Sequence, residues 1–419
     1  MSIETDEELS ALKKEAPGGR WWNQPRTVWA VAFAATVSFM GIGLVDPILP
    51  AISEELHATP TETSLLFTSY LFITAVAMFF SSWVSGRLGA RNTLLLSLAV
   101  VVAFSLASGL APTVAWIIAF RALWGLGNAL FISTALSTII SESRDADGAI
   151  ILYEAAIGVG MAVGPLAGGL LGTLSWRAPF IGTSVLMAGA FVAILLLLRK
   201  HAAEKVHTPL FAAFTGLTRL PLLSFALVAL FYNMAFFVVL AWSPYPLGFN
   251  AMGIGLTFFG WGLGLALTSV IAAPALTARF KRTTVIAHGL VSLLVVLVLA
   301  ALLVDFAPVL VVLIIAAGLI LGVMNTVLTE SSMAATDLPR PVASSAYSGI
   351  RFLGGAVAPP VASAAGAALG ASAPYLYGAG ALAVALVVFF VLHRRLTVVD
   401  GAHQDSALEE AEALIGNAD

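Results

Sequence analysis

The sequence predicts an all-α membrane protein with twelve transmembrane helices in two pseudo-symmetric six-helix bundles. Three observations support this prediction. Of the 419 residues, 59% are hydrophobic and only 10% are charged, whereas about 25% of a soluble domain is charged. Twelve apolar segments reach the length of about 20 residues that a helix needs to cross a bilayer. These segments form two sets of six, and the two sets are related by a nearly constant shift in residue number.

The same composition excludes several classes of protein. The net charge of −3 argues against a nucleic-acid binder, which would need a basic stripe. The absence of cysteine excludes disulfides, thiolate metal sites and cysteine nucleophiles. The glycine-rich stretches lack the Gly-Lys-Ser/Thr ending of a P-loop, and the histidines lack metal-ligand spacing. We therefore expect no cofactor, no metal and no nucleic-acid partner.

The apolar segments define the expected domain organisation. A cytoplasmic tail at 1–26 precedes a first bundle at 27–198, a cytoplasmic linker at 199–221, a second bundle at 222–396 and an acidic tail at 397–419. The alternating pattern of a membrane barrel is absent, so the spans are expected to be helices. The twelve expected spans are 27–50, 64–85, 93–111, 113–140, 148–173, 179–198, 222–242, 254–277, 284–304, 307–330, 343–369 and 373–392.

The positions of Lys and Arg predict the orientation of the chain. With the N-terminus in the cytoplasm, all but three of the 20 Lys and Arg residues fall in cytoplasmic segments. Of these three, Arg177 faces outside, and Arg121 and Arg351 lie within spans. The first apolar run already has the length of a span, so no cleaved signal peptide is expected. The sequence thus predicts a multi-pass protein of the cell membrane with both termini in the cytoplasm.

An internal repeat relates the two bundles. The first span ends in Asp46-Pro47-Ile48-Leu49-Pro50, and the seventh ends in Ser243-Pro244-Tyr245-Pro246. Small residues recur every four positions in the fifth and eleventh spans, as Gly160, Gly164, Gly168, Gly172 and as Gly354, Ala358, Ala362, Gly366. Such stripes let two helix backbones approach closely in lipid. Static packing is one interpretation. The equivalent places in both halves favour a sliding or rocking interface, as in transporters built from six-span repeats.

Three motifs lie in the first bundle. They are Gly160-x3-Gly164-Pro165-x2-Gly168-Gly169 in the fifth span, Arg121-x2-Trp124-Gly125-x-Gly127 in the fourth, and Gly86-Arg87-Leu88-Gly89-Ala90-Arg91 after the second. With these motifs the chain resembles the major facilitator superfamily, and within it the twelve-span drug:proton antiporters. The third motif departs from the family pattern, because Gly86 stands where the family usually has Asp.

The resemblance implies export by rocker-switch alternating access, with a proton gradient as the energy source. Arg121 matches an arginine that is linked in this family to proton coupling. The glycine stripe of the fifth span is then expected to be the moving contact. The expected gating residues are Gly160, Gly164, Pro165, Gly168, Arg87, Arg91 and Glu330.

Ionisable groups within spans are candidate functional residues, because each costs about 2.5–3.5 kcal/mol on insertion scales. Asp46 and Arg121 are expected to form an ion pair for proton coupling; alternatively, Asp46 only caps the bend at Pro47. Glu154 has no basic residue in its own span, and we expect it to bind protons or cationic substrates. Its alternative is a hydrogen bond across the bundle. Glu330 and Arg351 can pair as an inner gate or a helix-end anchor, or contact substrate.

Polar and aromatic side chains within the spans indicate a substrate pathway. A pathway of Asn, Tyr, Phe and Trp with few charges suits a moderately hydrophobic or cationic solute. The alternative is helix–helix hydrogen bonding, worth about 0.6 kcal/mol on average. The expected substrate-binding residues are Tyr70, Trp124, Asn128, Tyr153, Tyr232, Asn233, Phe236, Asn325 and Arg351.

Taken together, these features predict proton-coupled efflux of small hydrophobic or cationic compounds. The expected partners are the substrate, protons and the lipid bilayer, and the expected state is a monomer. An exporter or symporter of a specific metabolite, such as a sugar, a siderophore or an amino acid, is the alternative. An enzyme would need a convergent catalytic set and a sensor a soluble output domain, and the sequence shows neither.

Overall fold

The computed structural model describes residues 24–143, 146–198 and 208–400, and every regular element in these ranges is a helix. Twelve helices are long and apolar enough to cross a membrane, which confirms the expected fold class. The spanning helices are α2 (Arg26–Gly43), α4 (Pro60–Leu88), α5 (Ala90–Leu110), α6 (Val114–Glu142), α7 (Ala146–Gly172), α8 (Ala178–Leu197), α10 (Leu220–Trp242), α12 (Ala251–Leu267), α14 (Arg282–Leu302), α15 (Ala307–Ala334), α16 (Arg340–Leu369) and α17 (Ala373–Val391).

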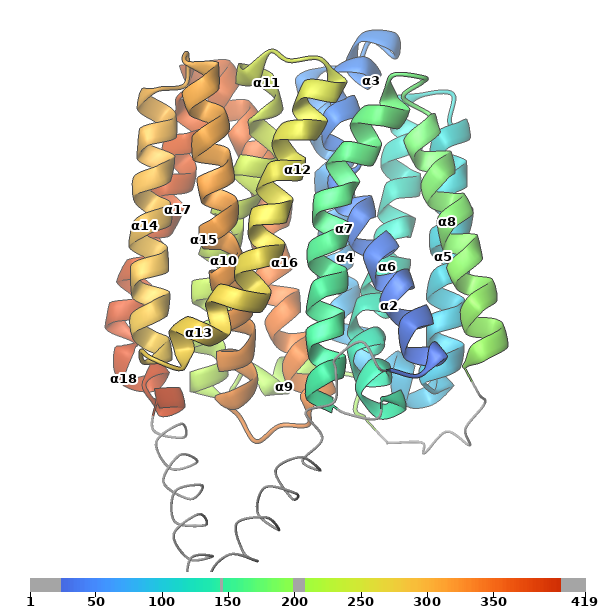
Figure 1. Cartoon of the computed structure of the whole chain (residues 1–419), viewed down its shortest axis with the longest axis vertical. Helices are drawn as coiled ribbons and strands as arrows, with labels where there is room; N and C mark the ends of the chain where they lie inside the picture. Colours follow the sequence, from blue (N-terminus) through green and yellow to red (C-terminus); the bar gives the residue numbers. More distant parts are fainter. Residues whose placement is uncertain (1–23, 144–145, 199–207, 401–419) are drawn as a thin grey trace, which may run out of the picture.

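Short helices lie at the two ends of the bundle (Figure 1). One end holds α3 (Leu49–Glu55) and α11 (Pro244–Leu247), and we call it the α3 end. The opposite end, the α9 end, holds α9 (Ala212–Gly216), α13 (Ala273–Thr277) and α18 (His393–Leu396).

The first span ends earlier than the sequence suggested. Helix α2 stops at Gly43, and the 3₁₀ turn η1 (Asp46–Ile48) and α3 follow it. Pro47 explains the break, because a proline ring clashes with the carbonyl four residues before it and provides no N–H for a helical bond. Residue 43 is that position, so the helix ends where Pro47 requires it. The span expected at 27–50 is therefore corrected to Arg26–Gly43.

The eighth span changes its winding before a proline. Helix α12 passes into the π-helical turn η2 (Thr268–Ala272) and then into α13. A π-turn shifts the hydrogen-bond register within a helix. Pro274, at the start of α13, cannot donate the usual backbone bond, and the altered register lets the span continue past it.

The internal repeat is visible in the helix contacts. In the N-terminal half (α2 to α8), α2 packs on α7 and α8, α4 on α6, and α5 on α6 and α8. The C-terminal half (α10 to α18) repeats this with α10 on α16 and α17, α12 on α15, and α14 on α15 and α17. Individual bonds repeat as well. Thr74 Oγ1 donates to Gly125 O over 3.1 Å, and Ser269 Oγ donates to Gly322 O over 3.0 Å.

Two helix pairs join the halves, α7 with α12 and α4 with α16. Helices α7 and α12 lie side by side at the centre of Figure 1. Their backbones touch along much of their length: a Cβ added to Gly262 would lie 2.5 Å from Ala162 Cα, and one added to Gly169 would lie 2.5 Å from Ala251 O. Small residues therefore let the halves meet closely.

At the α9 end, the second pair is joined by the connecting helix α9. Helix α9 contacts both α4 and α16. Its Phe214 ring stacks on Phe79 of α4 with centroids 4.7 Å apart. On the other side, a Cβ added to Gly216 would lie 3.2 Å from Leu338 Cδ1. The segment that connects the halves therefore also packs against both of them.

Candidate functional site

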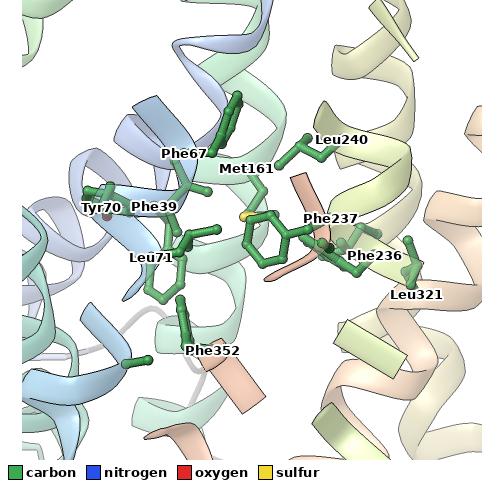
Figure 2. Close-up of a cluster of buried hydrophobic side chains, with 14 of the residues drawn as sticks. Phe39, Phe67, Tyr70, Leu71, Met161, Phe236, Phe237, Leu240, Leu321 and Phe352 are labelled. Carbon is green, nitrogen blue, oxygen red and sulfur yellow. The ribbon is translucent and has the colours of Figure 1, made fainter. Parts of the chain in front are cut away.

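An apolar and aromatic cluster lies between the two halves (Figure 2). All of its labelled side chains are buried and belong to one continuous core. Both halves contribute, so the cluster is a shared surface rather than the interior of either bundle. The N-terminal half supplies Phe39, Phe67, Tyr70, Leu71 and Met161, and the C-terminal half supplies Phe236, Phe237, Leu240, Leu321 and Phe352. We call this set the midplane cluster.

Most members of the midplane cluster were not predicted from the sequence. Only Tyr70 and Phe236 were expected to bind substrate, whereas residues such as Phe67, Phe237 and Phe352 were not. An apolar side chain in an apolar helix does not reveal whether it faces lipid or another helix. The available signal is proximity to polar residues, since Phe352 directly follows Arg351.

On the N-terminal side, Arg121 is held against aromatic rings. The side chain is fully buried, and its Nε donates to Leu66 O over 2.9 Å. Its Cζ lies 4.7 Å from the ring centroid of Tyr70 and 5.1 Å from that of Trp124. Aromatic faces attract cations, by about 2 kcal/mol or more where water is excluded. The predicted residues Tyr70, Arg121 and Trp124 are thus brought together.

Asn128 extends this group to α2. Its amide donates to the Tyr70 hydroxyl, and its carbonyl accepts a hydrogen bond from Ser38 of α2. Asn128 and Ser38 are buried, and buried amides require such partners. Three helices of the N-terminal half, α2, α4 and α6, therefore meet through one polar network beside the midplane cluster. Tyr153, also predicted, is buried in α7.

On the C-terminal side, Arg351 of α16 binds two asparagines. Its Nη2 donates to Asn325 Oδ1 of α15, and its Nε donates to Asn233 Oδ1 of α10 over 3.4 Å. Asn233 Nδ2 in turn donates to Arg351 O over 2.9 Å. Tyr232 donates to Leu321 O over 3.0 Å. The structure thus joins Asn233, Asn325 and Arg351 in one hydrogen-bonded group. Tyr232 is outside this group, because its hydroxyl donates to the backbone of Leu321.

The expected pair of Glu330 and Arg351 is corrected by these contacts. Arg351 binds amides, and Glu330 is not among its partners in the described part of the chain. Glu330 is exposed near the end of α15. Glu330 is five residues beyond Asn325, about 1.4 turns further along the helix, so the two residues are not brought together although both lie toward the same end of the bundle.

The glycine stripe of the fifth span faces α2, within the N-terminal half. A Cβ added to Gly164 would lie 2.5 Å from Met40 O, and Gly160 and Gly168 approach Thr36 O and Leu44 O in the same way. The halves meet instead along other positions of α7, including Gly169. The stripe that is expected to be the moving contact therefore packs on α2 within its own half. Its gating role stays a prediction.

Two further gating candidates, Pro165 and Arg87, lie in α7 and in the last turn of α4. Pro165 touches both neighbours of α7: its ring faces Gly43 of α2, and its carbonyl faces Gly255 of α12. Arg87 lies over the ring of Trp83, with Cζ 4.4 Å from the centroid. Directly after α4, Gly89 has a φ of +78°, which glycine adopts without strain.

Arg91 is the remaining gating candidate, and it is bound within its own half. Its Nε donates to Leu198 O over 2.7 Å and its Nη2 to Leu195 O over 2.8 Å. These carbonyls belong to the C-terminal end of α8, where a cation is favourable. Arg91 therefore ties α5 to α8 rather than one half to the other.

Two proton-coupling candidates remain outside the described side chains. Asp46 begins η1 and Glu154 lies in α7, but the structure does not describe either side chain, so the expected pair of Asp46 and Arg121 stays a prediction. Within the described residues, no group of three His, Cys, Asp or Glu side chains could hold a metal ion.

Comparisons with known proteins place this site in a family context. Residues 31–245 match the Major Facilitator Superfamily. The multidrug efflux protein YfmO of Bacillus subtilis (strain 168) is 45% identical over 382 residues, covering 91% of this chain and 96% of that protein. The tetracenomycin C resistance and export protein of Streptomyces glaucescens is 29% identical over 295 residues, covering 68% of this chain and 50% of that protein.

A solved structure has the same fold. It is a bacterial homologue of the human lysosomal transporter Spinster, in an inward-facing and unoccupied conformation, with a TM-score of 0.67. The match covers 89% of this chain and 96% of that chain at 15% sequence identity. At this identity the likeness concerns the fold alone.

Proposed function

The chain belongs to the major facilitator superfamily, and from this premise we propose that it exports small, largely hydrophobic or cationic compounds in exchange for protons. The relatives named for multidrug efflux and for drug resistance and export support the direction of transport. The proposal concerns a transporter, so no bond of the substrate is made or broken.

The observation that carries this proposal is the midplane cluster. It is shared by two halves that meet through the pairs α7 with α12 and α4 with α16. Transporters built from two repeats place their substrate near the membrane midplane, between the repeats, and rock one repeat against the other. Rocking about these two pairs would expose the apolar side chains alternately at the α3 end and at the α9 end. A hydrophobic solute suits such a surface.

Proton coupling is assigned to Asp46, Arg121 and Glu154. Arg121 supports this assignment because its guanidinium lies over the ring of Tyr70, a member of the midplane cluster. A change of charge near Arg121 would therefore act on a side chain that also faces the solute. Intramembrane charges are expensive and mark proton pathways in transporters.

The proposed orientation places the α9 end in the cytoplasm, together with both termini. The basic residues Arg279, Lys281, Arg394 and Arg395 are exposed at this end, in agreement with the positive-inside rule. The proposed location is the cell membrane, and the proposed transport unit is a monomer, because each half supplies part of the cluster within one chain.

Everted membrane vesicles provide the test. An acidic lumen should drive uptake of the fluorescent hydrophobic cation Hoechst 33342 into vesicles that contain the protein, and nigericin should abolish this uptake by collapsing the pH gradient. Vesicles that accumulate no compound of a hydrophobic dye panel, with or without the gradient, would contradict the proposed function. Accumulation of one metabolite alone would favour the metabolite exporter instead.

Substitution of the acids tests the coupling residues. Glu154→Gln and Asp46→Asn should lose gradient-driven uptake while still binding the dye. Glu54→Gln is the matched control, because Glu54 is exposed in α3 and outside the proposed pathway. Full gradient-driven uptake by Glu154→Gln would remove Glu154 from the mechanism without affecting the export function itself.

A further inference from the structure

The C-terminal half contains a half-buried cation within a span, Arg351, for which the described residues show no acidic partner. The described partners of Arg351 are the amides of Asn233 and Asn325, the ring of Phe352 with its centroid 6.0 Å away, and the buried Tyr347 within electrostatic range. Amide and phenol groups accept hydrogen bonds and orient a guanidinium, but they carry no negative charge. None of these partners is therefore a counter-ion.

The acids of the C-terminal half lie elsewhere. Residues 208–400 contain only Asp305, Glu330, Asp337 and Asp400. The first three are exposed near helix ends or in loops, and Asp400 accepts hydrogen bonds from Thr283 at the start of α14. An arginine within a membrane bundle is usually paired or marks a ligand pathway. Since no acid of either half is a partner of Arg351 among the described residues, the second possibility follows.

The geometry directs this charge toward the midplane cluster. The three bonded residues come from three helices, and each lies within about one helical turn of a cluster member. On α10, Asn233 precedes Phe236; on α15, Asn325 follows Leu321; and on α16, Arg351 precedes Phe352. A solute whose apolar body contacts the cluster would therefore have its polar end within reach of Arg351.

The N-terminal half differs in this respect. Its arginine, Arg121, is fully buried against two aromatic rings, whereas Arg351 is partly exposed. The two intramembrane cations thus have different surroundings: one is enclosed by its own half, and the other is held by two amides beside the surface that both halves share.

From these contacts we propose that the exported compounds include aromatic monocarboxylates, with the carboxylate bound by Arg351 and the aromatic body on the midplane cluster. The planar guanidinium can donate two parallel hydrogen bonds to a carboxylate, which is stronger than a bond between neutral groups. Asn233 and Asn325 hold the guanidinium in place for this contact. This inference rests on the proposed export function and extends its substrates to acids.

Binding of matched probe pairs to the purified full-length protein tests the proposal. The pairs are 1-pyrenebutyrate with 1-pyrenebutanol, and 1-naphthylacetate with 1-naphthylacetamide, measured by tryptophan fluorescence at pH 7.4. The wild type should bind each acid at least about tenfold more tightly than its neutral partner. Arg351→Gln should remove this preference, while the affinity for the neutral probes changes less than about twofold.

Two further variants separate a binding role from a structural one. Arg351→Lys keeps the charge but not the planar fork, and should retain only part of the preference. Arg279→Gln removes an exposed cation from a loop and should leave the preference unchanged. Equal binding of acid and neutral probes by the wild type, or an unchanged preference in Arg351→Gln, would overturn the inference.

Transport in everted vesicles keeps this inference distinct from the proposed function. If Arg351→Gln still accumulates Hoechst 33342 while it loses the acid preference, the inference is supported and the fold is intact. If the wild type accumulates the dye but shows no acid preference, only the inference fails. If the wild type accumulates no dye panel compound at all, the export function fails regardless of the binding result.

Discussion

Arg91 and Arg177 stand at the first turns of two antiparallel helices, α5 and α8, and each caps the C-terminal end of the other's helix. Arg91 donates to Leu195 O and Leu198 O. Arg177 Nη1 donates to Gly109 O and Ala111 O, each over 2.9 Å. The last carbonyls of a helix lack intrahelical partners and carry partial negative charge. One pair of helices is therefore fastened at both membrane surfaces by the same interaction.

This reciprocal capping predicts that Arg177→Gln destabilises the protein. The substitution removes two hydrogen bonds from a charged donor, and we expect a loss of about 1–3 kcal/mol because Arg177 is only partly buried. Thermal unfolding in detergent measures it. Arg219→Gln is the matched control, since Arg219 is exposed. Equal melting temperatures of the two variants would contradict the capping role.

The approach of α7 to α2 predicts a large effect of one methyl group. A Cβ at Gly164 would lie 2.5 Å from Met40 O, whereas a Cβ at Gly189 of α8 would meet nothing within 4 Å. Gly164→Ala should push the two backbones apart, costing roughly 1–3 kcal/mol as in other overpacked cores, and reduce transport. Gly189→Ala should leave stability and transport unchanged. Melting temperature and dye uptake should be compared for the two variants.

The Tyr70 hydroxyl and its ring have separable roles. Tyr70→Phe leaves the buried Asn128 amide without its acceptor, at a cost of about 1–3 kcal/mol, but keeps the ring beneath Arg121. Tyr70→Leu also removes this ring and should destabilise further. Tyr377→Phe is the control, because the Tyr377 hydroxyl is buried with no hydrogen-bond partner in the described chain. Thermal unfolding measures the stabilities. Equal melting temperatures of Tyr70→Phe and Tyr377→Phe would show that the Tyr70 hydroxyl does not stabilise the fold through its hydrogen bond to Asn128.

The contact of α7 with α12 at the α3 end can be locked. A Cβ added to Gly172 would lie 3.9 Å from Ala251 Cβ, close to the usual Cβ separation of about 3.8 Å in disulfides. Because the chain has no cysteine, Gly172→Cys with Ala251→Cys places the only two thiols. Oxidation should form a disulfide and stop transport, and reductant should restore it. A Cβ at position 172 would also lie 2.6 Å from Ile48 Cγ2, so Gly172→Cys alone is the reference for the pair. Its transport should be the same under oxidising and reducing conditions, and transport by the oxidised pair would argue against opening at this end.

The start of α4 provides a pH-dependent feature outside the membrane. Thr59 N and Thr59 Oγ1 donate to Glu62 Oε2 over 2.9 and 2.8 Å, and these bonds to the carboxylate lower the pKa of Glu62 below 4.5. Because the pKa of Glu62 is lower in the folded than in the unfolded protein, its carboxylate stabilises the fold above pH 4.5. The protein loses this stabilisation as the pH falls through the folded-state pKa. Thr59→Ala keeps the backbone N–H, which is the larger cause, and removes only the hydroxyl donor. It should therefore raise the pKa of Glu62 part of the way toward 4.5, as measured by NMR with labelled Glu. An unchanged pKa would contradict this cause.

Much of the architecture follows from local chemistry along the chain. Apolar runs of sufficient length predict spans because the bilayer requires satisfied backbone bonds, and Ala178–Leu197 lies within one residue of the expected 179–198. The close-packing stripes were also visible, since glycine spacing is a property of one helix. Pro47 predicts a bend, but the helix ends four residues before it. The reason is that the proline ring clashes with the carbonyl of the residue four places earlier.

The sequence alone therefore determined the membrane class, the twelve helices, the repeat and the presence of Arg121 and Arg351 within spans. Only the tertiary structure decided what these groups meet. It turned the stripe of Gly160 and Gly164 toward α2, bound Arg351 to two amides instead of Glu330, and brought Phe67 and Phe237 into one cluster. The physical reason is that the hydrophobic periodicity of a helix in lipid does not distinguish its lipid-facing side from its packed side. The faces are selected only when the helices pack.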